Sequence, residues 1–112
     1  GIVAKLNAGG DAPMYACRAW VNFNGIDGVV IRGSGNISGV VRVSEGVSDV
    51  SFQTPMQDIN YAVSLSYSGE IGASGYVSPA PTSPSTFRII FSDPNDGSRR
   101  ADKSFVAVAI FR

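Results

Sequence analysis

The chain has 112 residues and a mass of 11.7 kDa, which is the size of a single domain. Its nine basic and nine acidic side chains cancel and are scattered, so the basic surface that nucleic-acid binding needs is missing. Charged residues make up only 16% of the chain, against about 25% in ordinary domains, and no apolar run approaches the roughly 20 residues of a membrane span. We therefore expect one domain with a surface of small neutral residues, no nucleic-acid partner and no membrane insertion.

The first segments along the chain are a connector and a strand that is apolar on both faces. Residues 1–13 end in a turn cluster closed by Pro13 and predict an N-terminal arm that leads to the domain at 14–112. Within the predicted strand 14–23, Met14 and Trp20 lie opposite an apolar face that includes Cys17, which we expect to be buried.

The predicted last strand, at 103–111, is also apolar on both faces. A sandwich strand usually buries one face and exposes the other. A second copy of the chain is therefore expected to cover the remaining apolar side chains. The candidates for this contact are Met14, Trp20, Val108 and Ile110.

The middle of the chain predicts short antiparallel strands. A strand at 29–32 is expected to end where residues 33–36 supply two glycines, and 37–43 and 47–53 form a hairpin around the turn 44–46. Alternation over 59–67 predicts a strand with Ile59, Tyr61 and Tyr67 on its core face.

The remaining segments complete an all-β chain. Residues 68–84 are rich in Gly, Ser and Pro and predict the longest loop. A strand with alternating Phe87, Ile89 and Phe91 follows, and then a tight turn at 93–97. Since no helical period persists, we expect an antiparallel β-sandwich of about seven or eight short strands.

Catalytic and metal-binding patterns are weak. The chain has no histidine, which removes the commonest general base and the usual zinc ligand sets. Glu45 and Glu70, the two glutamates, fall in turn or loop sequence where water keeps carboxylates ionised. The turn at 93–97 resembles the start of a calcium loop, but Ser104 stands where the loop's last glutamate belongs. We expect no enzymatic activity, no cofactor and no metal.

One aromatic residue is a candidate for ligand contact. A tyrosine stacks on a sugar when its ring is exposed beside hydrogen-bonding groups, and Tyr76 lies among Ser and Gly with no alternation to bury it. Binding residues on β scaffolds are often carried by loops. The candidates from the loops at 68–85 and 92–103 are Tyr76, Glu70, Ser68, Ser74, Asn95, Asp96 and Arg99.

Four segments resemble the C-terminal domain of tailed-bacteriophage tail fibres, namely residues 12–25, 31–38, 50–63 and 106–112. The resemblance covers nearly the whole chain from residue 12 onward, and 68–84 and 92–103 match it poorly. It implies a homotrimeric β-sandwich tip that attaches the virion to a bacterial surface receptor, a glycan or a protein. It also implies a fibre shaft earlier in the same polypeptide and assembly into virions from chains made in the host cytoplasm.

Three functions therefore remain open. The first is a receptor-binding tip, for which we favour a glycan receptor. The second is a purely structural cap or decoration that ends a virion fibre. The third is a monomeric carbohydrate-binding module attached to an enzyme. A solution mass separates the third from the others, and adsorption to host cells separates the first two.

Overall fold

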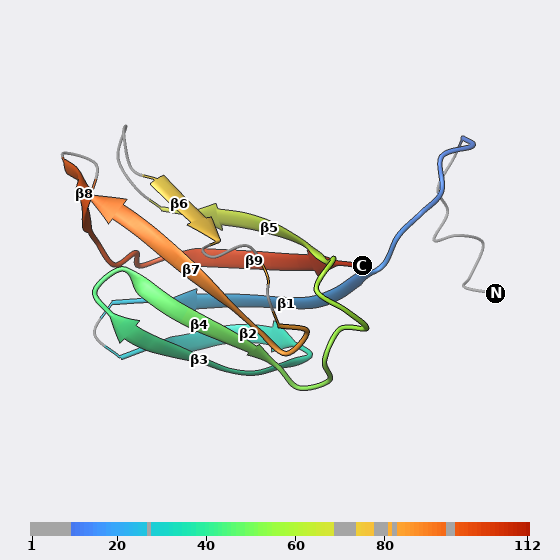
Figure 1. Ribbon diagram of the computed structural model, residues 1–112, viewed down its shortest axis with the longest axis horizontal. Coiled ribbons are helices and arrows are strands. Elements are labelled where there is room, and N and C mark those ends of the chain that lie inside the picture. The colour runs from blue at the N-terminus through green and yellow to red at the C-terminus, as the bar shows by residue number, and fades with distance from the viewer. Residues whose placement is uncertain (1–9, 27, 69–73, 78–80, 82, 94–95) are drawn as a thin grey trace.

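The computed structural model describes residues 10–26, 28–68, 74–77, 81, 83–93 and 96–112. These residues form nine strands in two antiparallel sheets (Figure 1). They contain no helix, and hence none long and apolar enough to cross a membrane. The expected all-β antiparallel fold is therefore confirmed.

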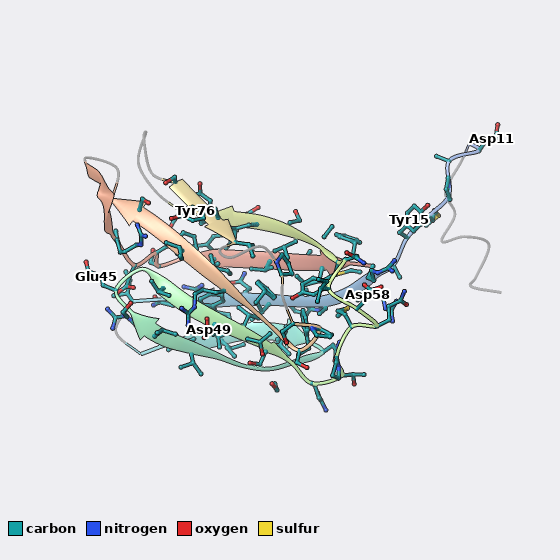
Figure 2. The ribbon with its side chains drawn as sticks, in the orientation of Figure 1. Asp11, Tyr15, Glu45, Asp49, Asp58 and Tyr76 are labelled. Atoms are coloured by element: carbon teal, nitrogen blue, oxygen red, sulfur yellow. The ribbon has the colours of Figure 1, made fainter. Side chains whose placement is uncertain are left out.

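The two sheets pack face to face. Sheet A has the order β2–β1–β9–β5, with β1 at Cys17–Asn24, β2 at Val30–Gly35, β5 at Ala62–Tyr67 and β9 at Val106–Phe111. Sheet B has the order β3–β4–β7–β6, with β3 at Ile37–Ser44, β4 at Val47–Phe52, β6 at Ser74–Val77 and β7 at Thr86–Asp93. A fifth strand of this sheet, β8 at Asp96–Arg100, pairs with β7. The segment before β1 extends away from both sheets, as the position of Tyr15 shows (Figure 2).

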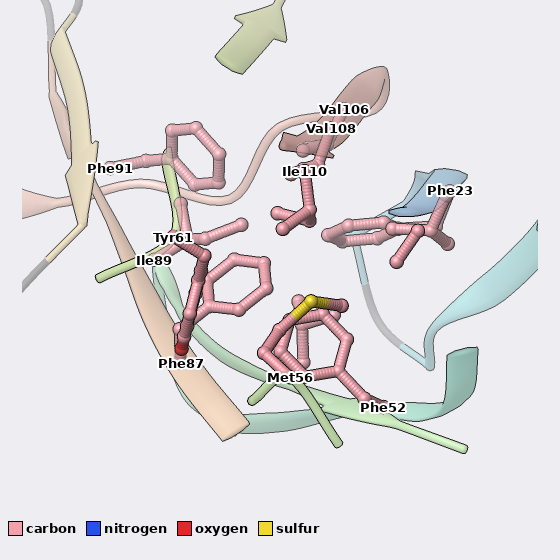
Figure 3. Packing of buried hydrophobic residues seen from close by; sticks show 13 residues of the cluster. Phe23, Phe52, Met56, Tyr61, Phe87, Ile89, Phe91, Val106, Val108 and Ile110 are labelled. Atoms are coloured by element: carbon pink, nitrogen blue, oxygen red, sulfur yellow. The ribbon is translucent and has the colours of Figure 1, made fainter. Parts of the chain in front are cut away.

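The core lies between the sheets and is built from alternate residues of β1, β4, β7 and β9 (Figure 3). An aromatic cluster joins the two layers, because the Tyr61 ring lies 5.4 Å from that of Phe52 and 6.2 Å from that of Phe87. The predicted burial of Tyr61 is confirmed, and the alternating residues of the next predicted strand, Phe87, Ile89 and Phe91, are buried as well. The hairpin around 44–46 is confirmed as well, with Gly46 at a positive φ of 73°.

The prediction that Val108 and Ile110 face a second copy is wrong. Their side chains are 4% and 0% exposed, inside the core. Strand β9 lies beside β1 with Val108 opposite Val21 and Ala109 opposite Trp20, so Val108 shares the inner face with Val21. Both faces of this segment are apolar, and composition alone did not show which set points inward.

Cys17 and Ile59 also differ from the prediction. Cys17 begins β1 with its side chain exposed, and its Sγ donates to the carbonyl of Ala19 at 3.1 Å. Ile59 is exposed and precedes β5. The register of β1 against β9 shifts between Cys17 and Ala19, and Ile59 lies before the start of β5, so the alternation in the sequence does not continue to these two positions.

Residues 33–36 do not end the second strand as expected. Strand β2 continues through Gly35, and the chain turns at Asn36, which has a positive φ of 54°. The Asn36 side chain supports this unusual backbone by donating to the carbonyls of Arg18 and Thr54 and by accepting from the N–H of Thr54 at 2.7 Å. The turn therefore falls on Asn36, the last residue of the segment that was expected to break the strand.

The segment 68–84, expected to be a loop, contains strand β6. This strand pairs with β7, and Gly75 faces inward where a Cβ would lie 2.6 Å from the Phe91 ring. Tyr76 is therefore on the outer face of a strand. Four residues, one of them glycine on the buried face, were too few to show alternation in the sequence.

An ion pair fastens the end of β9 to the loop between β4 and β5. Arg112 donates from Nε and Nη2 to the two carboxylate oxygens of Asp58, at 2.8 and 2.6 Å. This bond, together with one from the Asn60 N–H, holds the pKa of the Asp58 carboxyl well below its usual range.

Because the folded state lowers this pKa, the contribution of Asp58 to stability should be complete above the ordinary aspartate pKa of about 4 and should decline as the pH falls below it. We expect Asp58→Asn to lower the urea midpoint at pH 6 and to have a smaller effect at pH 2.5. Asp11→Asn, in the exposed N-terminal segment, is the control. A loss that stays constant with pH would contradict the role of the pair.

The corrected position of Ile110 can be tested by truncation. Ile110→Ala should lower the free energy of unfolding by about 2–5 kcal/mol, since it leaves a cavity in the core. Val41→Ala, at an exposed position of β3, should change it little. Urea unfolding measures both, and equal small effects would place Ile110 on the surface.

Candidate binding surfaces on the two sheets

The outer face of sheet A carries an exposed tryptophan held on two glycines. Trp20 projects from β1, is 46% exposed, and lies between Gly35 on β2 and Ala109 on β9. A Cβ added at Gly35 would lie 2.4 Å from the indole Nε1 of Trp20. A Cβ added at Gly33 would lie 3.1 Å from the indole Cη2. The ring therefore spans both glycines, and only residues without a side chain allow it to lie so close to β2.

Beside the indole, a shallow groove of about 290 Å³ follows β9. Ala107 and Ala109 contribute from β9, Trp20 and Asn22 from β1, and Ser64 and Ser66 from β5. None of the lining residues is charged. Such a surface suits an apolar or neutral partner, because nothing in it attracts or repels an ion.

The amide of Asn22 at the side of this groove is held in place. Its Oδ1 accepts from Arg32 Nη1 at 3.1 Å, while Arg32 Nη2 donates to the Ser104 carbonyl at 2.7 Å. The Arg32 guanidinium also lies 6.0 Å from the centre of the Phe105 ring. The arginine is thus engaged at the rim, which leaves the centre of the face uncharged.

The outer face of sheet B has a different chemistry. Tyr76 on β6 is 41% exposed and lies opposite Ile90 on β7. Arg88 lies on the same face of β7, two residues from Ile90. It donates from Nε and Nη2 to the two carboxylate oxygens of Asp49 on β4, at 2.7 and 3.0 Å. These bonds raise the pKa of the Arg88 guanidinium. Tyr76 and Asp49 are labelled in Figure 2.

Among the predicted ligand-contact residues, the structure places Ser74 and Tyr76 together on the outer face of β6. Ser68 is engaged in the fold, since its N–H donates to the Phe105 carbonyl and its hydroxyl accepts from the Phe105 N–H. The residues Glu70 and Asn95, and the side chains of Asp96 and Arg99, lie outside the described part of the structure.

The subunit-contact candidates divide evenly. Met14 and Trp20 are exposed, whereas Val108 and Ile110 belong to the core.

Among the side chains that the structure describes, no three acidic or cysteine residues gather closely enough to hold a metal ion.

Sequence reasoning missed Asp49 and Arg88. They are 39 residues apart, and only the register between β4 and β7 brings them together.

Sequence reasoning also missed the support of Trp20 by Gly33 and Gly35. A Gly-x-Gly segment in a strand next to one with an exposed tryptophan is a signal that could have indicated this packing.

Comparison with protein-family models, with curated proteins and with solved structures gives no match to this chain.

The glycine support of Trp20 predicts a spectroscopic result. Gly35→Ala should displace the indole, because the new Cβ would overlap it. Since the chain has a single tryptophan, we expect red-shifted emission and faster quenching by acrylamide. Gly39→Ala is the matched control, because a Cβ at Gly39 meets nothing within 4 Å. Identical spectra for the two variants would contradict this packing.

Proposed function

We propose that this chain is the receptor-binding tip of a tailed-bacteriophage tail fibre, and that it works as a homotrimer to attach the virion to the bacterial surface. Trp20 carries the proposal, because its exposed ring lies beside an uncharged groove of small residues on this sheet face. The resemblance of residues 12–25 and 106–112 to fibre tips supports it, since these segments supply β1 and β9 at the centre of that face.

A second copy of the chain suits the outer face of sheet A as a partner. Copies that meet through an uncharged surface bring no like charges together. Tryptophan is enriched among residues that dominate binding energy at such contacts. Met14, which precedes β1, adds a further exposed apolar side chain.

Trimerisation also supports attachment energetically. Once one subunit of a tip has bound, the other two bind at an effective concentration near millimolar. A weak affinity at each subunit is then sufficient to hold a virion on a cell. A purely structural cap would also be a trimer, but it would bind no receptor. Adsorption to cells therefore separates the receptor-binding tip from the structural cap.

We expect light scattering at micromolar concentration to give three times the 11.7 kDa chain mass. Trp20→Glu should reduce it toward a single chain, because a carboxylate in the contact would have to be desolvated. Val41→Glu, at an exposed site on sheet B, should leave the mass unchanged. A wild-type mass of one chain would contradict the trimer.

The attachment function has its own measurement. The purified protein should compete with virions that carry this tip and should lower the rate at which they adsorb to host cells. The Trp20→Glu variant should compete far less, because it loses multivalency. A wild-type trimer that leaves adsorption unchanged would support the structural cap instead.

A further inference from the structure

The outer face of sheet B combines three kinds of group: an aromatic ring, an ion pair and a pair of hydroxyls. They are the exposed ring of Tyr76, the ion pair of Asp49 with Arg88, and the hydroxyl pair of Ser51 with Thr86, whose oxygens lie 3.3 Å apart. Such groups together are suited to a polar ligand with an apolar face.

The strand register arranges these groups in order along β7. Tyr76 lies opposite Ile90, Asp49 opposite Arg88, and Ser51 opposite Thr86. Ile90, Arg88 and Thr86 alternate along one face of β7, so successive groups are spaced by about 7 Å. The ring, the ion pair and the hydroxyls therefore follow one another over about 13 Å on three neighbouring strands.

The chemistry of the ion pair indicates what could bind. Arg88 and Asp49 are partly exposed, at 41% and 29% of their side chains, so atoms of both reach solvent. The guanidinium has five N–H donors, and only those on Nε and Nη2 bond to Asp49. The donors of Arg88 and the acceptors of Asp49 lie side by side, so they can bond to two neighbouring hydroxyl groups of a ligand. Hydrogen bonds in which one partner is charged are stronger than those between neutral groups.

The charge balance of the pair indicates a neutral ligand. Asp49 compensates the charge of Arg88, so the pair gives no net attraction to an anion. The Tyr76 ring supplies an aromatic face on which the apolar side of a pyranose can stack.

We infer that the outer face of sheet B binds a neutral saccharide of the bacterial surface. A pyranose ring lies on Tyr76, and its neighbouring hydroxyls bond to Arg88 and Asp49. This inference rests on the proposed function and assigns the receptor class and its place. Sheet A is assigned to the contact between copies, since its groove has an alanine floor and offers no charged hydrogen-bonding group.

The test measures binding of the whole protein to immobilised neutral O-antigen polysaccharides, with acidic capsular polysaccharides alongside. Tyr76→Ala should weaken binding to a neutral polysaccharide about tenfold, the order expected for losing one aromatic stack. Tyr15→Ala is the matched control, because Tyr15 is 75% exposed and lies on the segment before β1. The double variant Asp49→Asn with Arg88→Gln should also weaken binding.

Circular dichroism and the solution mass confirm that each variant folds and assembles as the wild type does. Unchanged binding in Tyr76→Ala and in the double variant would overturn the inference. The inference would also be overturned if Tyr15→Ala weakened binding as much as Tyr76→Ala does. Binding to acidic polysaccharides alone, or no binding to any neutral polysaccharide, would overturn it as well. If the protein still blocks virion adsorption while it binds no neutral polysaccharide, the fibre-tip function stands and the saccharide site is wrong.

Discussion

The antiparallel pairing of β1 with β9 is the contact on which the rest of the structure depends. It joins residues from nearly opposite ends of the chain, from Cys17 opposite Phe111 to Phe23 opposite Val106. The inward residues of both strands form the sheet A side of the core, and the outward residues Trp20 and Ala109 become neighbours. This pairing thus sets both the buried layer and the uncharged groove beside Trp20. Since this contact spans so much sequence, its formation costs loop entropy before other contacts repay it.

The sequence was sufficient to predict the fold class and most of the strands. Alternation in β4 and β7 is clear, because one face of each strand meets the core and the other meets solvent. It was insufficient where both faces are apolar, as for Val108, and where a strand has only four residues, as for β6. Local pattern cannot supply the packing that decides these positions.

The binding surfaces were predictable only in part. Tyr76 was identified correctly as an exposed aromatic residue, although it is on a strand instead of a loop. Trp20 was expected to lie outside the core, in contact with a second copy of the chain, but its support by Gly33 and Gly35 depends on the pairing of β1 with β2. The pairing of Asp49 with Arg88 likewise depends on register between strands distant in sequence. Single residues were therefore accessible to sequence reasoning, whereas their combinations were not.

The central position of β1 has a mechanical consequence. The segment that precedes β1 leaves the sandwich roughly along the strand direction, and β1 is hydrogen-bonded to β2 on one side and to β9 on the other (Figure 1). A pull on that segment, with the far end of the domain held, loads both rows of hydrogen bonds in shear. The bonds then share the force instead of opening one after another, as they would at a peeled edge strand. A domain connected in this way can resist tension applied through that segment without a disulfide.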